Sequence, residues 1–265
     1  MKVEGKVLVV TGGGNGIGRE VVLQLIKHGA KVAAVDLSAE GLAETSRLSG
    51  DSTLLSTHAL SITDLPAVEH LPSEVIARHG AIDGLINVAG IIQPFVKIND
   101  LSYEAIGRVM NVNFWGVVHM IKTFLPELLK RPEAHIVNVS SMGAYAPVPG
   151  QSVYGASKAA VKLLSEGLHS ELLDTNVGVT VVFPGATATN IAGNSGITMA
   201  GADASESKFK MTPPTETARL IIEGIEQKKY HVFSGSDAKM MDRMARYLPN
   251  RVGKIIYNQM KSLLS

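Results

Sequence analysis

The sequence predicts an α/β fold: a single-domain, doubly wound parallel sheet of about seven strands with helices on both faces. Three observations predict it. The 265 residues are 45% hydrophobic, enough to bury one large core without a second domain. Short Val- and Ile-rich runs recur that are apolar on both sides, as strands covered on both faces must be. Segments with apolar residues three or four positions apart separate these runs, as amphipathic helices do.

Seven apolar runs are the predicted strands, in the order 6–10, 31–36, 52–60, 82–90, 134–141, 177–185 and 230–235. The segments between and after them predict helices over 17–28, 39–48, 64–79, 102–129, 152–174 and 214–227. Pro126 is expected to kink or end the fourth helix, because proline lacks a backbone N–H.

Two segments depart from this alternation. Residues 187–212 are rich in small residues and longer than the usual connection, so they are either a lid over a site or a tolerated insertion. We expect 1–235 to form the main unit of the domain, with 187–212 as its lid. Residues 236–265 are then a helical extension of the same domain. This extension is expected to pack on its own chain or a sister subunit rather than on substrate or a membrane surface.

Composition excludes several classes of partner. The formal net charge is +1, from 25 basic and 24 acidic residues, so no global field draws the chain to nucleic acid. No window approaches the roughly 18 apolar residues of a membrane span. The chain has no cysteine, its first residues lack a signal-length apolar core, and its eight histidines show no metal-ligand spacing. We expect a cytoplasmic protein without a metal, whose partners are small molecules or copies of itself.

Residues 7–36 join a strand, a glycine-dense turn, a helix start, a second strand and an acidic residue. Glycines in such a turn let backbone N–H groups approach a phosphate, whose charge is favoured at a helix N-terminus. Asp36 follows Gly18 by 18 positions, close to the ~20 of a dinucleotide site. A carboxylate there accepts hydrogen bonds from both ribose hydroxyls and repels a 2′-phosphate, so NAD(H) is favoured over NADP(H). The alternative is an ordinary glycine turn with a surface aspartate.

Six motifs follow one another along the chain: TGGGNGIG (11–18), NVAG (87–90), MNVNFWG (110–116), VNVSS (137–141), YGASK (154–158) and FPGATAT (183–189). In this order and spacing they resemble the short-chain dehydrogenase/reductase family, in its single-domain branch, over about 5–235. The resemblance implies a Rossmann-like sheet and hydride transfer with a nicotinamide dinucleotide.

The same resemblance implies which residues are catalytic. Its serine stands 13 places before the tyrosine, which selects Ser141 rather than Ser140. Its asparagine is Asn113 rather than Asn111, and the YGASK motif supplies the remaining two residues. The implied catalytic residues are Asn113, Ser141, Tyr154 and Lys158.

The chemistry of these residue types supports the assignment. A free tyrosine has a pKa near 10, too high to take a proton readily from an alcohol. Lys158 lies one helical turn from Tyr154, and with an oxidised nicotinamide it would lower that pKa. Ser141 could orient the reacting oxygen, and Asn113 is expected to hold a water on the path to Lys158. The alternatives are that Tyr154 and Lys158 form an ordinary surface pair, that Ser141 caps a strand end, and that Asn113 is purely structural.

The resemblance also implies a set of residues around the dinucleotide. Ser61 stands where most relatives carry an aspartate, which weakens the expected contact to adenine, and Thr187 replaces a branched apolar residue. The expected cofactor-binding residues are Gly12, Asn15, Gly16, Ile17, Gly18, Asp36, Ser61, Ile62, Asn87, Ala89, Gly90, Tyr154, Lys158, Pro184, Gly185, Thr187 and Thr189.

The predicted substrate pocket is apolar. Small and apolar residues follow the strand that ends near Ser141, and the expected lid carries Ile191, Ile197, Met199, Phe209 and Met211. Such a site favours a lipophilic secondary alcohol or ketone, such as a steroid, fatty-acyl derivative, terpenoid or aryl alcohol, although Lys208 and Lys210 could serve an anionic tail. The expected substrate-binding residues are Ser141, Gly143, Tyr145, Gln151 and Tyr154.

The sequence therefore predicts an NAD(H)-dependent oxidoreductase that interconverts a secondary alcohol and a ketone. One alternative is a non-catalytic protein that senses the dinucleotide. Another is a serine hydrolase using Ser141 and Lys158, which lacks a nucleophile elbow. The resemblance further implies a homodimer or homotetramer built through helices 102–129 and 152–174.

Overall fold

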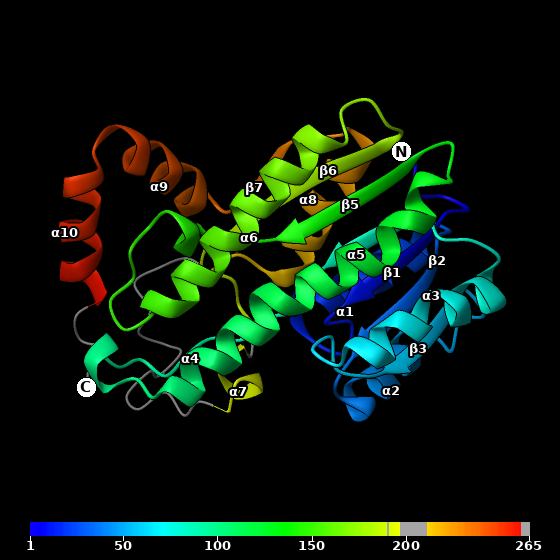
Figure 1. The fold of residues 1–265 in the computed structure, drawn as a ribbon, viewed down its shortest axis with the longest axis horizontal. Coiled ribbons are helices and arrows are strands. Elements are labelled where there is room, and N and C mark those ends of the chain that lie inside the picture. The colour runs from blue at the N-terminus through cyan, green and yellow to red at the C-terminus, as the bar shows by residue number, and fades with distance from the viewer. Residues whose placement is uncertain (190, 197–210, 261–265) are drawn as a thin grey trace.

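The structure, a computed structural model, describes residues 1–189, 191–196 and 211–260. It confirms the predicted fold class, because seven parallel strands form one sheet in the order β3-β2-β1-β4-β5-β6-β7 (Figure 1). The chain leaves β1 toward β2 on one side and returns to β4 on the other, so the strand order reverses between β1 and β4. Ligands bind at such a switch point, beyond the carboxyl ends of the strands. The strands are β1 Val7–Thr11, β2 Lys31–Asp36, β3 Leu55–Ala59, β4 Gly84–Asn87, β5 Ala134–Val139, β6 Val177–Pro184 and β7 His231–Ser234.

Helices cover both faces of the sheet. The layer of α3, α5 and α6 packs on one face through residues such as Leu71, Phe124 and Val161. The layer of α1, α2 and α8 packs on the other through Val22 and Ile221. The helices are α1 Gly16–Lys27, α2 Ala39–Leu48, α3 Leu65–His79, α4 Tyr103–Met110, α5 Gly116–Leu129, α6 Ser152–Glu171, α7 Ile191–Asn194, α8 Pro214–Glu226, α9 Ser236–Tyr247 and α10 Pro249–Met260.

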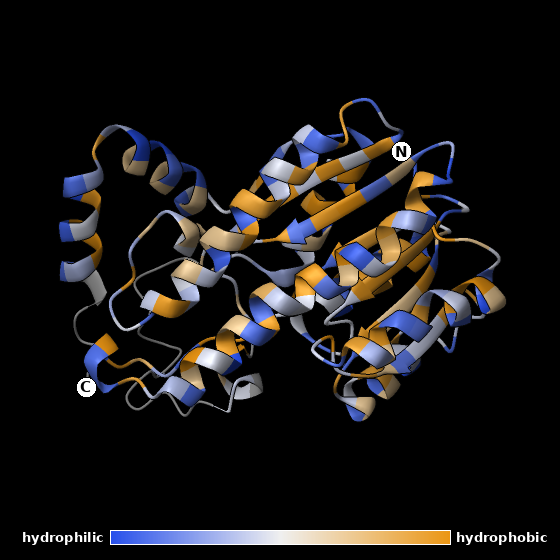
Figure 2. Cartoon of the chain, in the orientation of Figure 1, coloured by the Kyte–Doolittle hydropathy of each residue, from blue (hydrophilic) through white to orange (hydrophobic). Residues whose placement is uncertain are grey.

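The central strands are apolar on both sides because both helical layers cover them. All five residues of β1 are buried, and the central strands carry long apolar stretches between the helices (Figure 2). The predicted strand 82–90 is shorter than expected, since it ends at Asn87. There the hydroxyl of Thr11 accepts hydrogen bonds from the amides of Val88 at 3.1 Å and Ala89 at 3.2 Å. This side chain replaces a strand partner and turns the chain away from the sheet.

The predicted helix 102–129 forms as three consecutive segments, α4, a π-helical turn at Asn111–Trp115, and α5. Of the two expected effects of Pro126, the ending of the helix does not occur, because α5 continues to Leu129. A proline in the last turn removes one hydrogen bond from a helix that is about to end, so its cost there is small.

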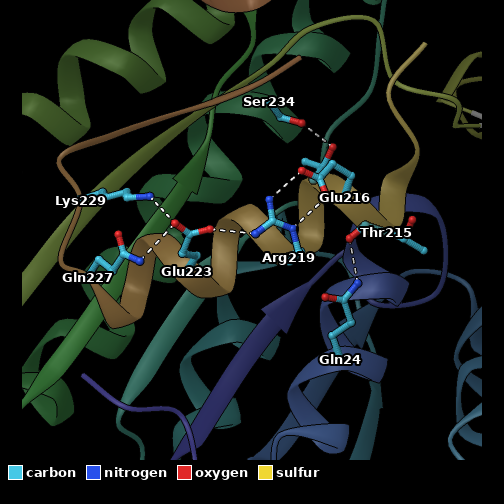
Figure 3. Close-up of polar contacts among 9 residues, drawn as sticks. Gln24, Thr215, Glu216, Arg219, Glu223, Gln227, Lys229 and Ser234 are labelled. Carbon is cyan, nitrogen blue, oxygen red and sulfur yellow. Dashed lines mark hydrogen bonds and ion pairs between the residues drawn. The ribbon is translucent and has the colours of Figure 1, made fainter. Parts of the chain in front are cut away.

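The exposed side of α8 carries an ion-pair network. Arg219 lies between Glu216 at 2.7 Å and Glu223 at 2.9 Å, one turn before and one turn after it (Figure 3). Such exposed pairs stabilise a helix by only a few tenths of a kcal/mol. At the start of α8, the side chain of Gln24 donates to the carbonyl of Thr215 at 2.8 Å and ties α1 to α8.

The C-terminal extension forms α9 and α10, which lie at the end of the molecule far from β3 (Figure 1). Met241 of α9 and Val252 and Ile256 of α10 form a small buried cluster with Ala146. The extension therefore packs on its own chain, next to the segment that follows β5. None of the helices in the described part of the chain is long and apolar enough to cross a membrane.

Candidate active site

The turn after β1 has room only for glycine at critical positions. Gly12 has a φ of 73°, and a Cβ there would lie 3.0 Å from the amide nitrogen of Ala89. At Gly18 a Cβ would come 2.1 Å from the carbonyl oxygen of Gly12. The start of α1 therefore packs directly on the turn. This arrangement aims the first amides of α1 at the space beyond the strand ends.

A cavity of about 670 Å³ opens above this turn. Its size falls within the range of small-molecule and cofactor sites. It contains most of the residues expected around a dinucleotide, namely Gly12, Asn15, Gly16, Ile17, Gly18, Asp36, Ser61, Ile62, Ala89, Gly90 and Thr189. The other expected residues, Asn87, Tyr154, Lys158, Pro184, Gly185 and Thr187, are not among the residues that line it.

Asp36 is held firmly at one end of the cavity. One carboxylate oxygen accepts from the amide of Gly14 and the other from the amide of Ser38, both at 2.9 Å. Glu40 and Glu44 also line the cavity, and the carboxylate of Glu44 pairs with Arg47 at 2.7 Å.

Arg19, which the sequence analysis missed, is the cation at this end of the cavity. Its guanidinium donates to the carbonyls of Gly14 and of Gly41, and its Nε donates to the hydroxyl of Thr45 at 3.1 Å. These bonds hold α2 against the glycine turn. The sequence could have pointed to Arg19 through its position directly after Gly18. Its partners in α2, however, become apparent only in the folded structure.

The expected cofactor residue Asn87 is buried beneath the cavity. Its side-chain nitrogen donates to Asn138 Oδ1 at 2.8 Å, and the nitrogen of Asn138 donates to Ser165 Oγ at 2.8 Å. The chain of bonds joins β4, β5 and α6. Asn87 thus connects the central strands to the helix that carries Tyr154.

Tyr154 and Ser141 meet beyond the carboxyl end of β5. Ser141 begins a 3-10 turn, Met142–Ala144, and its hydroxyl accepts from the amide of Gly143 at 3.0 Å. A Cβ at Gly143 would lie 3.3 Å from the Tyr154 ring and 3.4 Å from Ser141 Oγ. Burial raises the pKa of Tyr154, and the hydrogen bond with Ser141 works in the opposite direction. The Tyr154 phenol is therefore protonated at neutral pH and has the Ser141 hydroxyl as a hydrogen-bond partner.

Lys158 is buried one helical turn further along α6. Its ammonium donates to the carbonyl of Val139 at 3.0 Å, and burial lowers the pKa of Lys158 to about 8. A Cβ at Gly90 would lie 3.1 Å from Lys158 Nζ and 3.2 Å from Asn113 Oδ1. Because Gly90 has no side chain, it leaves room for both the Lys158 ammonium and the Asn113 oxygen beside the loop after β4.

Asn113 lies in the π-helical turn and is fully buried. Its oxygen accepts from the amide of Ile91 at 2.8 Å, and its nitrogen donates to the carbonyl of Ile91 at 2.9 Å and to Ser157 Oγ at 3.0 Å. Ser157 in turn donates to the carbonyl of Tyr154 at 2.7 Å. π-Helical turns often occur at functional sites. This one brings the amide of Asn113 to the loop after β4 and to the helix of Tyr154.

The neighbouring alternatives point elsewhere. The hydroxyl of Ser140 donates to the backbone carbonyl of Lys158 at 2.7 Å, and Asn111 is exposed. Ser140 thus anchors α6, whereas Ser141 faces Tyr154. The catalytic roles of Ser141 and Asn113 stay predictions.

Gln93 is a second residue that the sequence analysis missed. It is fully buried, and its side-chain oxygen accepts from the amides of Val153 at 2.8 Å and Tyr154 at 2.9 Å. These are amides of the first turn of α6, which have no partner within the helix. Gln93, on the loop after β4, therefore caps the helix at the tyrosine itself.

Two expected substrate residues make internal contacts. Gln151 is buried, and its side-chain nitrogen donates to the carbonyl of Gln93 at 2.7 Å. Tyr145 donates its hydroxyl to the carbonyl of Ala238 at 2.9 Å, and its ring lies 5.5 Å from that of Phe183. Burial, with Asp242 and Asp237 nearby, raises the pKa of Tyr145. The polar groups of both side chains thus hold loops of the site in place, and their contact with substrate stays a prediction.

The loop after β6 approaches the cavity from the opposite side. Gly185 donates its amide to the carbonyl of Ser234 at 2.8 Å, and Thr187 pairs with Thr212 in a short parallel bridge. Thr189 lies against the glycine turn, since a Cβ at Gly16 would be 3.3 Å from its methyl group. The loop thus reaches from the end of β6 to the start of α1.

Both ends of the expected lid are described, whereas residues 190 and 197–210 lie outside the described residues. Arg108 of α4 donates to the carbonyl of Ser195 at 2.8 Å, and the hydroxyl of Ser195 accepts from the amide of Ile92 at 3.0 Å. These bonds hold α7 beside the cavity. Ile197, Met199, Lys208, Phe209 and Lys210, which the sequence analysis assigned to the lid, lie outside the described residues.

No cluster of three or more His, Asp or Glu side chains that could hold a metal ion occurs among residues 1–189, 191–196 and 211–260. Buried His135 is occupied instead by a hydrogen bond between its Nε2 and Thr180 Oγ1 at 2.8 Å. Burial lowers the pKa of His135 to about 4. It is therefore a neutral core histidine.

Comparison with known proteins identifies close relatives. The family model for short chain dehydrogenases matches residues 6–199. The chain is 33% identical over 261 residues to the putative oxidoreductase SadH of Mycobacterium tuberculosis, covering 96% of this chain and 94% of that protein. It is 34% identical over 188 residues to the 3-oxoacyl-[acyl-carrier-protein] reductase FabG of Thermotoga maritima, covering 70% and 75% of the two chains.

Two solved structures share the fold. A short-chain dehydrogenase/reductase from Burkholderia phymatum in complex with NAD aligns with a TM-score of 0.84 at 23% identity, covering 96% of each chain. A short-chain dehydrogenase from Burkholderia cenocepacia in complex with NADP aligns with a TM-score of 0.81 at 25% identity, covering 97% of this chain and 99% of that one.

Proposed function

The chain belongs to the short-chain dehydrogenase/reductase family and is an oxidoreductase, and from this premise we propose that it interconverts a secondary alcohol and a ketone with NAD(H). One observation carries the proposal. Tyr154, Ser141, Lys158 and Asn113 lie together beyond the carboxyl ends of β4 and β5, beside a glycine-lined cavity. A phenol, an alcohol hydroxyl and a buried amine in such a place suit proton transfer to or from a reacting oxygen.

The cavity suits a nicotinamide dinucleotide. Its glycine turn leaves room for a diphosphate at the start of α1, where a Cβ at Gly12 or Gly18 would intrude. Asp36, with both oxygens already oriented by backbone amides, is placed to accept from the adenosine ribose. When bound, the nicotinamide would accept or supply the hydride of the reaction.

The charge around Asp36 favours NAD(H) over NADP(H). Asp36 and Glu40 would repel a 2′-phosphate, whereas the carboxylate of Glu44 is paired with Arg47 at 2.7 Å. Arg19 also lines the cavity, but it already donates to two carbonyls and to Thr45. The two similar solved structures contain NAD in one case and NADP in the other, so this preference depends on the residues of this chain.

The protonation of the centre suits both directions of the reaction. Because burial raises the pKa of Tyr154, the phenol is protonated and can donate its proton to a ketone oxygen. In alcohol oxidation the phenol must first lose its proton, and Lys158 would stabilise the phenolate as an ammonium. Burial lowers the pKa of Lys158 to about 8, so the amine is still mostly protonated at neutral pH and would supply that positive charge.

The remaining residues position the oxygen and the proton path. Ser141, bonded to both Gly143 and Tyr154, would share its hydroxyl with the substrate oxygen. Asn113 is held by both backbone groups of Ile91 and faces Lys158, so it would hold a water that exchanges protons with the ammonium.

The substrate is proposed to be lipophilic. Met142, Ala144 and Val148 follow Ser141, and the adjoining cluster of Ala146, Met241, Val252 and Ile256 is apolar. A steroid, fatty-acyl derivative, terpenoid or aryl alcohol fits such surroundings. The name of the Thermotoga relative describes reduction of a 3-oxoacyl group, one of these classes.

The protein is proposed to form a homodimer or homotetramer through the helices on the α5 and α6 side. Large apolar side chains on this side are exposed, with Tyr103 at 92%, Trp115 at 50% and Leu163 at 69%. A second copy covering these helices would remove that apolar surface from water.

A panel of lipophilic alcohols and ketones, followed through the absorbance of NADH, tests the proposed reaction. We expect turnover with at least one pair, and a fall of about 10³-fold in kcat for Tyr154→Phe in a variant that still binds NADH. Unchanged turnover in that variant would overturn the assigned chemistry. Tight dinucleotide binding without turnover of any alcohol or ketone would favour the dinucleotide-sensing alternative.

A further inference from the structure

The first turn of α9 contacts two loops of the site at once. Asp237 accepts a hydrogen bond at 2.8 Å from the amide of Ala186, in the loop after β6. The next residue, Ala238, accepts at 2.9 Å from the hydroxyl of Tyr145, which follows the 3-10 turn of Ser141. One helical turn in the C-terminal extension therefore holds the loops on both sides of the reactive centre.

Asp237 supplies a side-chain acceptor from outside the loop, which is otherwise held mainly by backbone hydrogen bonds and by a bond from the Thr187 hydroxyl to the carbonyl of Gly185 at 3.2 Å. The amide of Gly185 donates to Ser234, the amide of Ala188 to Thr212, and the carbonyl of Ala186 accepts from Thr212, at 2.8 to 3.0 Å. The amide of Ala186 has the Asp237 carboxylate instead. A carboxylate bonded to an N–H forms a stronger hydrogen bond than a neutral acceptor. The conformation of residues 185–188 therefore depends on a residue from outside the sheet.

The surroundings leave space for this carboxylate. At Gly185 a Cβ would come 2.2 Å from Asp237 Oδ1, and at Gly235 it would come 2.3 Å from the same oxygen. Gly235 also has a φ of 95°, a conformation that favours glycine. Two glycines thus make room for one side chain, which indicates a defined position rather than a chance surface contact.

We propose that Asp237 is a positioning residue that holds the 185–187 backbone where the nicotinamide end of the cofactor binds. This inference rests on the proposed function, since that function assigns the loop to the nicotinamide. The adenosine end lies at Asp36, on a different loop and a different strand. Asp237 therefore acts on one end of the dinucleotide and not on the other.

Comparison of two ligands tests this selectivity. NADH contains the nicotinamide, and ADP-ribose lacks it. For Asp237→Ala we expect NADH affinity to fall about tenfold, the change from losing roughly 1.4 kcal/mol, and ADP-ribose affinity to stay the same. We also expect kcat to fall more than KM rises. Asp237→Asn keeps an accepting oxygen of the same size and should recover most of the NADH affinity.

A matched control lies on the same helix. Asp242 pairs with Arg246 one turn further along α9, away from the loop after β6. Asp242→Ala removes a carboxylate from α9 as well, and we expect both affinities to match the unmodified protein. Equal losses for NADH and ADP-ribose in Asp237→Ala, or a lower Tm with both affinities intact, would overturn the positioning role.

The packing at Gly185 supplies an independent test. Gly185→Ala would push the Asp237 carboxylate aside, so alone it should weaken NADH as Asp237→Ala does. Added to Asp237→Ala, the methyl group has room and should cause little further loss. Fully additive losses would contradict the contact. Failure of the proposed function is distinguishable, because the unmodified protein would then itself fail to bind NADH or turn over a substrate. The asparagine variant, which retains the side-chain volume, keeps the test valid if the alanine variant does not fold.

Discussion

The glycine turn and the reactive centre both lie beyond the carboxyl ends of the strands but are built in opposite ways. The turn consists of backbone, and all its glycines and Asp36 come from residues 7–36. The reactive centre consists of side chains from the π-helical turn, the end of β5 and α6. The turn depends on residues without a side chain, because a Cβ at its glycines would block it. The centre depends on functional atoms that are present and on the burial that sets their pKa values.

This difference predicts how each region responds to substitution. An added methyl group should disable the turn, whereas loss of a single oxygen or nitrogen should disable the centre with the fold preserved.

Gly18→Ala is expected to have the largest effect on the glycine turn, since it should reduce both nucleotide affinity and stability. Its Cβ would lie 2.1 Å from the carbonyl oxygen of Gly12, so α1 must move away from the turn. We expect about a hundredfold loss of NADH affinity and about 1–3 kcal/mol of stability, measured by fluorescence titration and urea unfolding. Gly253→Ala in α10, where a Cβ meets Pro147 at an ordinary 3.8 Å, should instead leave binding unchanged. Binding by both variants alike would refute the steric account of the turn.

Lys158→Met should change the pH profile as well as the rate. In the unmodified protein, the ammonium of Lys158 would lower the pKa of the Tyr154 phenol, so alcohol oxidation should rise at a lower pH than burial alone would allow. Without the ammonium, burial keeps the pKa of Tyr154 above its usual 10.0, so the rise should move to still higher pH and kcat at pH 8 should fall about 10²-fold. An unshifted profile would show that the titration does not involve Lys158.

The same variant tests stability. The folded protein binds fewer protons than the unfolded chain between pH 8 and pH 10.5, the ordinary pKa of a lysine, because burial lowers the pKa of Lys158. Stability should therefore rise with pH across this window and level off below pH 8, and the rise from this group should vanish in Lys158→Met. Urea unfolding at pH 8 and pH 10 measures the difference.

Asp36→Ala should have a smaller effect, confined to the nucleotide end. Loss of a carboxylate that accepts from ribose should weaken NAD binding about tenfold and raise the relative affinity for NADP, because less negative charge remains near the 2′ position. Glu40→Gln, which removes another negative charge from the same cavity, should raise the relative affinity for NADP as well but leave the affinity for NAD unchanged. A preference for NADP in the unmodified protein would contradict the assigned specificity.

Gln93→Leu should have the smallest effect, on the reactive centre alone. It removes the acceptor of the first amides of α6, including that of Tyr154, at a cost of about 1 kcal/mol. We expect kcat to fall a few-fold with NADH affinity unchanged, and Gln93→Glu, which keeps an acceptor at the helix N-terminus, to retain more activity. A change in nucleotide affinity without a change in kcat would contradict the proposed role of Gln93 in positioning the reactive centre.

The sequence by itself determined the parts of this protein that depend on local geometry. The alternation of apolar runs predicted the parallel sheet, because each strand and the helix that follows it show their own local periodicity. The glycines and Asp36 predicted the turn, because they lie within one strand–helix–strand unit. The spacing of Tyr154 and Lys158 predicted their shared helix face for the same reason.

Only the tertiary structure decided the contacts between distant segments. Arg19 meets α2, Gln93 caps α6 at Tyr154, and Asp237 reaches the loop after β6 across 51 positions of sequence. No periodicity marks such pairs, since each depends on where the sheet order places two separate loops. The pKa values of Tyr154 and Lys158 belong to the same category, because burial by the surrounding fold sets them.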